Sequence, residues 1–158
     1  MSNTKFRFAT KEDTSLILSF IKELAEYENL SNEVIADEKT LSEWIFDKNK
    51  AEVVFALEDE KEVGFALFFH NFSTFLGRAG IYLEDLFVLP KYRKRGHGKA
   101  LIKEIARIAV SRGCGRLELS CLDWNKDSID FYLSLGATKM DDWTVYRFAG
   151  ENLTNLSK

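Results

Sequence analysis

Cysteine, histidine and proline are scarce in this sequence, which has two Cys, two His and one Pro among 158 residues. Two cysteines are too few for the disulfide framework of a small secreted domain. Cys114 and Cys121 stand just before and near the end of one expected strand, which holds them too far apart for a bridge. His70 and His97 belong to no Cys/His cluster with zinc spacing. We therefore expect neither a disulfide nor a metal site.

An excess of one charge and a long apolar run are lacking too. The chain has 22 Lys and Arg against 25 Asp and Glu, a net charge of −3. That balance argues against a nucleic-acid partner and is compatible with a cationic substrate. No segment approaches the roughly 18 apolar residues of a membrane span, and the N-terminus lacks the apolar stretch of a signal peptide. We expect a cytoplasmic protein that does not bind membranes.

What the sequence does have is enough apolar material for one core. Hydrophobic residues make up 46%, and there are thirteen Phe, which fits a single domain over residues 1–158. Apolar residues at helical spacing predict helices after the capping residues Thr10 and Asp37, over 97–112, and after the capping residue Asn125, with Gly136 ending the last one. β-rich runs predict strands over 5–9, 51–58, 63–70, 81–89, 116–122 and 143–149. The order β-α-α-β-β-β-α-β-α-β indicates a mixed α+β sheet packed by helices.

A glycine-containing turn joins the fourth strand to the third helix. It has the pattern Arg93-x-x-Gly96-x-Gly98. Glycines allow positive φ, so successive N–H groups can converge on an anion, and the helix N-terminus adds unpaired N–H groups there. Further cations surround the turn, namely Lys94, Arg95 and Lys99. The spacing is not that of a Walker A loop or a Rossmann fingerprint. A pyrophosphate site is one interpretation; a solvated basic surface and a nucleic-acid patch are the alternatives.

Acidic and phenolic side chains lie in otherwise apolar patterns. Glu84 and Asp85 interrupt an apolar strand, where a charge is costly unless it is satisfied. Tyr132 has helical spacing with Ile129 and Leu133, which also fits a plain core residue. A carboxylate can bind an alkylammonium and take its proton, and a phenol can protonate a leaving thiolate. Both carboxylates are equally consistent with ordinary strand-edge positions.

These motifs occur in an order that resembles the GNAT superfamily of N-acetyltransferases. The strand and the R-x-x-G-x-G turn are followed by Asn125-x-x-Ser128 and by Phe131-Tyr132-x-x-x-Gly136-Ala137. Within the family, Tyr27-Glu28, Tyr82-Leu-Glu-Asp85 and Leu122-Asp-Trp-Asn125 are similar to the diamine (spermidine/spermine) acetyltransferases, and the last motif to their thialysine-acetylating branch. The resemblance implies a central twisted, mostly antiparallel sheet flanked by helices, and acetyl-CoA as co-substrate without a metal.

The resemblance also implies a role for each matching residue. Glu84 would accept the substrate's proton, through water, and Tyr132 would act as the acid. The amine would be bound by Tyr27, Glu28, Glu84 and Asp85. The donor would be bound by Leu86, Phe87, Val88, Arg93, Lys94, Arg95, Gly96, His97, Gly98, Lys99, Asn125 and Ser128. The acceptor would be a primary amine of a small diamine, polyamine or thialysine-like molecule, and relatives are commonly homodimers.

One loop departs from the polyamine enzymes. Residues 71–80 contain Phe75 and Arg78 and no acidic residue, although a long polycation needs several carboxylates along its channel. The alternatives therefore stay open: another amine (an amino acid, an antibiotic or a protein), or an acyl-CoA-binding sensor without catalysis.

Overall fold

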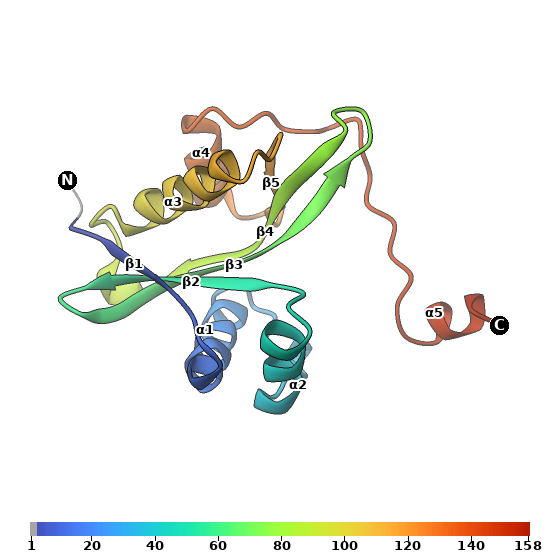
Figure 1. The fold of residues 1–158 in the computed structure, drawn as a ribbon, viewed down its shortest axis with the longest axis horizontal. Coiled ribbons are helices and arrows are strands. Elements are labelled where there is room, and N and C mark those ends of the chain that lie inside the picture. Colours follow the sequence, from blue (N-terminus) through green and yellow to red (C-terminus); the bar gives the residue numbers. More distant parts are fainter. Residues whose placement is uncertain (1–2) are drawn as a thin grey trace. The chain divides into compact units, whose positions relative to one another are not determined.

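The computed structural model describes residues 3–158, which divide into two compact units, one ending at Ser120 and the other spanning Cys121–Lys158. The first unit is built on a five-stranded sheet in the order β1-β2-β3-β4-β5 (Figure 1). Its strands are β1 (Lys5–Phe8), β2 (Glu52–Glu58), β3 (Lys61–Ser73), β4 (Arg78–Val88) and β5 (Leu117–Leu119). β1 to β4 are antiparallel, and β5 is parallel to β4. The expected mixed, mostly antiparallel α+β fold is confirmed.

Helices cover both faces of this sheet (Figure 1). α1 (Thr14–Tyr27) and α2 (Glu38–Ser42), which continues into a π-helical turn at Glu43–Asp47, lie on one face. α3 (His97–Ser111) lies on the other face. The apolar stripe of α1 packs on inward-facing residues of the sheet, so that the core of this face consists of Ile17, Phe20, Ile45, Val53, Phe55, Phe65 and Phe87.

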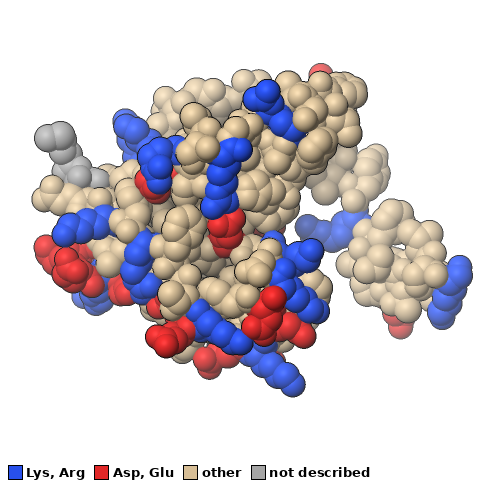
Figure 2. Space-filling model, viewed as in Figure 1, with Lys and Arg blue, Asp and Glu red and all other residues tan. Residues whose placement is uncertain are grey.

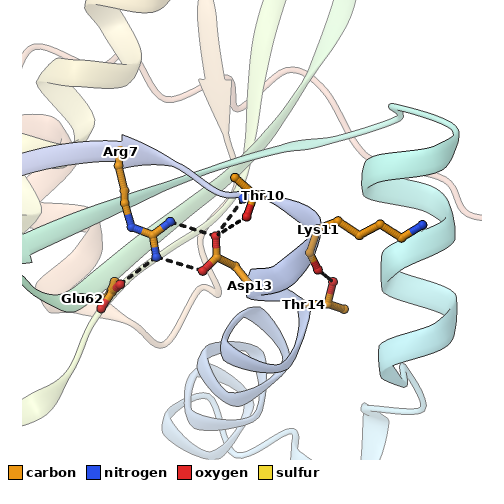
Figure 3. Close-up of polar contacts among 6 residues, drawn as sticks. All are labelled: Arg7, Thr10, Lys11, Asp13, Thr14 and Glu62. Atoms are coloured by element: carbon orange, nitrogen blue, oxygen red, sulfur yellow. Dashed lines mark hydrogen bonds and ion pairs between the residues drawn. The ribbon is translucent and has the colours of Figure 1, made fainter.

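Arg7 fixes the corner between β1 and α1. Its two terminal nitrogens donate to the carboxylate of Asp13 at 2.8 and 2.9 Å, and one of them also donates to Glu62 in β3 at 2.7 Å (Figure 3). The Asp13 carboxylate also accepts the backbone N–H of Thr10 at 2.8 Å, as the predicted capping box requires. The Arg7 guanidinium lowers the pKa of Asp13 to about 2. Sheet and first helix are thus joined by a charged, partly buried network.

The hairpin from β3 to β4 is longer than expected. Residues 71–73 and 78–80, predicted as loop, extend the two strands, and only 74–77 form the turn. Phe72 and Phe75 are exposed, as predicted. β5 is shorter than predicted and pairs only with Ile81–Leu83 of β4. This short pairing leaves the second half of β4 without a partner strand on that side within residues 3–158.

The second unit contains α4 (Lys126–Ser134) and α5 (Gly150–Leu156). The side chain of Asn125 caps α4 by accepting the N–H of Ser128 at 3.4 Å, and Gly136 with φ +98° follows the helix end, both as predicted. The strand expected over 143–149 is wrong: the segment is irregular and pairs with no strand in the described residues. Alternation creates strand propensity, but a strand also needs a ladder partner. The helix α5 was not predicted.

Candidate functional site

A β-bulge lies at the centre of the candidate site. Leu67 of β3 pairs with Asp85, but Phe68 pairs with Leu83, so Glu84 is an extra residue in β4. Because side chains alternate across a sheet, the extra residue reverses the faces of β4 beyond it. Asp85 therefore faces the α1 side, as does its partner Leu67, which packs against the α1-side core. Glu84 is exposed.

The bulge brings a carboxylate cluster together, formed by Glu28, Glu84 and Asp85. Glu28 follows the last residue of α1, and its pKa is raised by burial and by the charge of Glu84. Burial, reinforced by the charges of Glu84 and Glu28, raises the pKa of Asp85 from 3.8 to about 7. The cluster can accept a cation and a proton near neutral pH. All members were predicted as substrate-binding residues, and the structure brings them into one place.

β4 has an open edge next to this cluster. Its ladder with β5 ends at Leu83, while its ladder with β3 continues to Val88. From the bulge onward, no strand of the described chain pairs with β4 on the β5 side. Leu86, Phe87 and Val88, which were predicted to bind the donor through their backbone, lie along this edge. An extended amide ligand can hydrogen-bond to such an edge.

Arg93 occupies a position that the sequence did not suggest. Its Nε donates to the carbonyl of Val88 at 2.9 Å. Its guanidinium lies 4.8 Å from the ring centre of Tyr27 and 5.0 Å from that of Phe87. These cation–π contacts join the turn to the end of α1. One donor of the Arg93 side chain is therefore used within the fold, and its contact with a pyrophosphate stays a prediction.

The turn itself has the backbone conformation expected of an anion site. Lys94 has φ +63° and Gly96 has φ +87°, and Gly96 is the N-cap of α3. The N–H of Ala100 donates to the carbonyl of Gly96 at 3.0 Å. Among the hydrogen bonds of the described chain, none uses a backbone N–H of residues 94–99. These N–H groups and the positive end of the α3 dipole suit a phosphate.

His97 is buried, with 3% of its surface exposed, although it was predicted as a plain helix-start residue in the donor site. Its Nδ1 lies 2.7 Å from the hydroxyl oxygen of Thr4, and its Nε2 lies 2.8 Å from Oε1 of Glu58. Oε2 of Glu58 accepts a hydrogen bond from Arg95 at 2.6 Å. Sequence reasoning missed Thr4 and Glu58, because no local pattern joins residues so far apart in the chain.

The second unit contains the remaining predicted residues. Tyr132 lies in the middle of α4, and burial followed by the charge of Cys121 raises its pKa above the usual value. The phenol is therefore protonated at neutral pH, as a proton donor must be. Asn125 is buried at the start of α4, where it contacts the N–H of Ser128.

Comparisons with known proteins support the family resemblance. The model of the Acetyltransferase (GNAT) family matches residues 18–137, which include the bulge, the turn and α4. The chain belongs to the GNAT family of acetyltransferases. It is 37% identical to thialysine N-epsilon-acetyltransferase from Mus musculus, with 99% of both chains covered. It is 29% identical to an L-ornithine N5-acetyltransferase from Arabidopsis thaliana, covering 98% of this chain and 88% of the relative.

A solved structure has a similar fold over the whole chain. The chain resembles an integron cassette protein from the mobile metagenome of V. cholerae with a TM-score of 0.82 and 29% identity, covering 100% and 99% of the two chains. As a GNAT protein the chain is an acetyltransferase that acts on an amine. No group of His, Cys, Asp and Glu in residues 3–158 has an arrangement for a metal ion. No helix in that range is long and apolar enough to cross a bilayer.

Proposed function

We propose that the protein transfers an acetyl group from acetyl-CoA to a primary side-chain amine of a small substrate. The observation that carries this proposal is the carboxylate cluster at the β4 bulge, directly beside the open edge that leads to the turn. One arrangement of residues thus offers an ammonium site, an extended amide-binding edge and a phosphate site.

The residues of the turn and the open edge fit the donor. The backbone N–H groups of 94–99 would bind the pyrophosphate, helped by Lys94, Arg95 and Lys99, and a Cβ at Gly98 would meet no atom closer than 4.0 Å. The edge at Leu86–Val88 would bind the pantetheine amides and the acetyl carbonyl. Asn125 and Ser128, at the start of α4, would contact the donor as in the family that the chain resembles.

The carboxylates would bind and deprotonate the amine. A primary alkyl amine has a pKa of about 10.4, so it arrives as an ammonium at neutral pH. Glu84, exposed at the bulge, would accept the proton through a water molecule, while Glu28 and Asp85 hold the cation and Tyr27 packs beside it. An ammonium bound next to Asp85 favours its ionised form, so substrate binding would release the proton that Asp85 holds near neutral pH.

Tyr132 would protonate the departing thiolate. Burial raises its pKa, so the phenol is protonated at neutral pH and its O–H can be donated. It would donate to the negative charge that develops on the sulfur while the C–S bond breaks, and general-acid assistance at this step lowers the barrier. No covalent intermediate on the protein is needed, because the amine attacks the acetyl group directly.

The substrate that fits best is an amino acid with a terminal side-chain amine. The relatives named above acetylate thialysine and L-ornithine, which both carry an α-amino acid group. A groove of about 560 Å³ adjoins Tyr27 and is lined by both acidic Glu23 and Glu26 and basic Lys61 and Lys91. Such mixed charge suits a zwitterion. A polyamine would be attracted by the two glutamates of this groove but repelled by the two lysines, and residues 71–80 supply no further carboxylate.

We also propose a homodimer. Trp143, Val145, Tyr146 and Phe148 are between 60% and 86% exposed and lie in one segment. Such a concentration of aromatic surface marks a contact site. A second copy of the chain is the partner that is always present.

The function can be tested by a turnover screen. Purified protein is mixed with acetyl-CoA and a panel of thialysine, ornithine, lysine, putrescine, spermidine and an aminoglycoside; thiol release gives the rate, and product mass identifies the acetylated nitrogen. We expect the amino acids to be the best substrates and the Glu84→Gln variant to be slow. Binding of acetyl-CoA without thiol release on any amine would favour the sensor alternative. Faster turnover of spermidine than of the amino acids would refute the proposed substrate class.

A further inference from the structure

His97 and Arg95 are attached to the same carboxylate from opposite sides of Gly96. Nε2 of His97 lies 2.8 Å from Oε1 of Glu58, and a terminal nitrogen of Arg95 donates to Oε2 of the same residue at 2.6 Å. A carboxylate only accepts here, so the proton of this bond is on His97 Nε2. The other ring nitrogen of His97 contacts the hydroxyl of Thr4 at 2.7 Å. Both ring nitrogens are thus held, and the ring is buried.

The hydrogen bonds of Arg95 and His97 to Glu58 therefore connect the two neighbours of Gly96 to one carboxylate. Glu58 is the last residue of β2, so it is part of the sheet. The residues on both sides of Gly96 are bonded to this fixed point, which restricts the φ of +87° at Gly96. Glycine has the largest conformational freedom of all residues, and a free glycine turn must lose that freedom when a ligand orders it. The carboxylate removes part of this freedom before any ligand arrives.

We propose that Glu58 and His97 act as a staple that pre-organises the turn 94–99 for the pyrophosphate of the donor. This inference rests on the proposed function, because it assumes that the turn binds the donor. His97 is then a positioning residue: its ring points into the fold, toward Thr4 and Glu58, and its effect on the ligand passes through the backbone N–H groups beside it. Pre-organisation raises affinity by reducing the ordering cost of binding.

If the staple pre-organises the turn, its removal should weaken donor binding and leave the rate of acetyl transfer at saturation unchanged. In the His97→Phe variant the ring volume is kept and both hydrogen bonds are lost; in Glu58→Ala the anchor is lost. We expect each change to raise the Kd for coenzyme A, measured by calorimetry, roughly ten-fold, as expected for the loss of one or two hydrogen bonds. KM for acetyl-CoA rises in parallel, whereas kcat at saturation and KM for the amine stay within about two-fold.

The chain offers a matched control in the same strand. Glu52 is the first residue of β2 and accepts two hydrogen bonds from Arg112, at 2.7 and 2.8 Å. Glu52→Ala therefore removes a comparable carboxylate–arginine pair at the opposite end of β2, and it leaves the Kd for coenzyme A unchanged. His97→Gln, whose amide can still donate to Glu58, recovers part of the affinity that His97→Phe loses.

A second measurement does not depend on the ligand. Hydrogen exchange of the Ala100 amide, which donates to the carbonyl of Gly96, should be faster in the ligand-free His97→Phe and Glu58→Ala variants than in the wild type and in Glu52→Ala, while the amides of β3 keep their protection. If the wild type fails to bind coenzyme A but the exchange changes as expected, the proposed function is wrong and the staple stands. If affinity and exchange at the turn are the same in all four proteins, the staple is wrong. A fall in kcat with unchanged donor affinity also overturns it.

Discussion

Glu84 and Asp85 are adjacent in the sequence and yet have different surroundings. The bulge leaves Glu84 exposed and turns Asp85 toward the α1 side, where burial is the main cause of its raised pKa. The sequence pattern places both carboxylates in an apolar strand, but in the structure Asp85 is the one that lies in apolar surroundings. The physical cause is the inversion of side-chain alternation by one extra residue.

The raised pKa of Asp85 makes a prediction about stability. Between pH 4 and pH 7 the folded state holds a proton on Asp85, with its pKa of about 7, that the unfolded state has released. The free energy of unfolding therefore falls as pH rises through this range. In Asp85→Asn this decrease is absent. The free energy of unfolding of the variant minus that of the wild type should therefore rise by on the order of 3 kcal/mol between pH 4 and pH 8. Urea unfolding at each pH measures this difference.

Asp37→Asn is the control with the opposite sign. Hydrogen bonds from Thr40 lower the pKa of Asp37, so its ionised form stabilises the fold and this contribution disappears as pH falls through the lowered pKa. The wild type should therefore have the larger free energy of unfolding at high pH, and its advantage over Asp37→Asn should shrink as the pH falls. A stability difference for Asp85→Asn that is constant across the pH range would show that Asp85 is not in a desolvated site.

Tyr132 tests the proton-donor role. Tyr132→Phe keeps the ring and removes the hydroxyl, so the loss of stability should be on the order of 1 kcal/mol at most. If the phenol protonates the leaving thiolate, kcat should fall by roughly 10² to 10⁴. Steady-state turnover with the best amine measures this. Tyr146→Phe is the matched control, because it removes the other tyrosine hydroxyl of the same unit and keeps the ring. Full activity of Tyr132→Phe would reduce Tyr132 to a packing residue.

At the scale of elements, the sequence predicted those helices and strands that a local residue pattern determines. Helical spacing in α1 and α3 and β-rich runs in β2, β3 and β4 were sufficient, because each of these elements buries one regular face. The candidate carboxylates could be named because Glu28, Glu84 and Asp85 belong to recognisable motifs. The cation–π contacts of Arg93 and the anchor of His97 could not be predicted, because their partners are brought close only by the fold.

At the segment 143–149 the local pattern predicted a strand that the structure does not contain. Its composition favours a strand, but a strand forms only where another edge pairs with it. The helix α5 that follows has an apolar residue at Leu153 and another at Leu156, both exposed, and no pattern that separates it from a loop. Local propensity is thus a weaker guide in this part of the chain than in the sheet.

The turn 94–99 between β4 and α3 can be tested by substitution of Gly96. Val resists the φ of +87° at Gly96, and its side chain would also crowd the N–H groups of the turn. We expect acetyl-CoA to raise the melting temperature of the wild type by mass action and to leave that of Gly96→Val unchanged. Thermal denaturation with and without acetyl-CoA measures both effects.

Gly113→Val separates strain from the loss of the site. Gly113 follows the C-terminus of α3 with φ +75°, and a Cβ there would meet no atom within 4 Å. The substitution should cost similar backbone strain but leave the shift by acetyl-CoA intact. An undiminished shift in Gly96→Val would remove the turn from the donor site.

At the scale of the whole molecule, charge and apolar surface suggest different partners. Lys and Arg are interspersed with Asp and Glu on the face drawn in Figure 2, consistent with the net charge of −3. Such a surface offers no extended basic field for a nucleic-acid backbone. The exposed apolar segment is a different matter. Trp143, Val145, Tyr146 and Phe148 are each at least 60% exposed in the irregular segment 143–149, a concentration of apolar surface that marks a contact site.

The homodimer proposal predicts that this segment forms the contact between two copies. Burying an aromatic side chain removes about 150–250 Å² from solvent, so three aromatics from each of two copies account for on the order of 1,000 Å². That is close to the roughly 1,200–2,000 Å² of a stable interface. Val145→Asp places a charge in the contact, so sedimentation equilibrium should show a dimer for the wild type and a monomer for the variant. Val110→Asp is the control, because Val110 is 78% exposed on α3, and it should remain dimeric. A wild type that is monomeric at high concentration, or a Val145→Asp variant that still dimerises, would contradict the assignment of 143–149 as the interface, because a buried aspartate without a partner cannot be accommodated there at low cost.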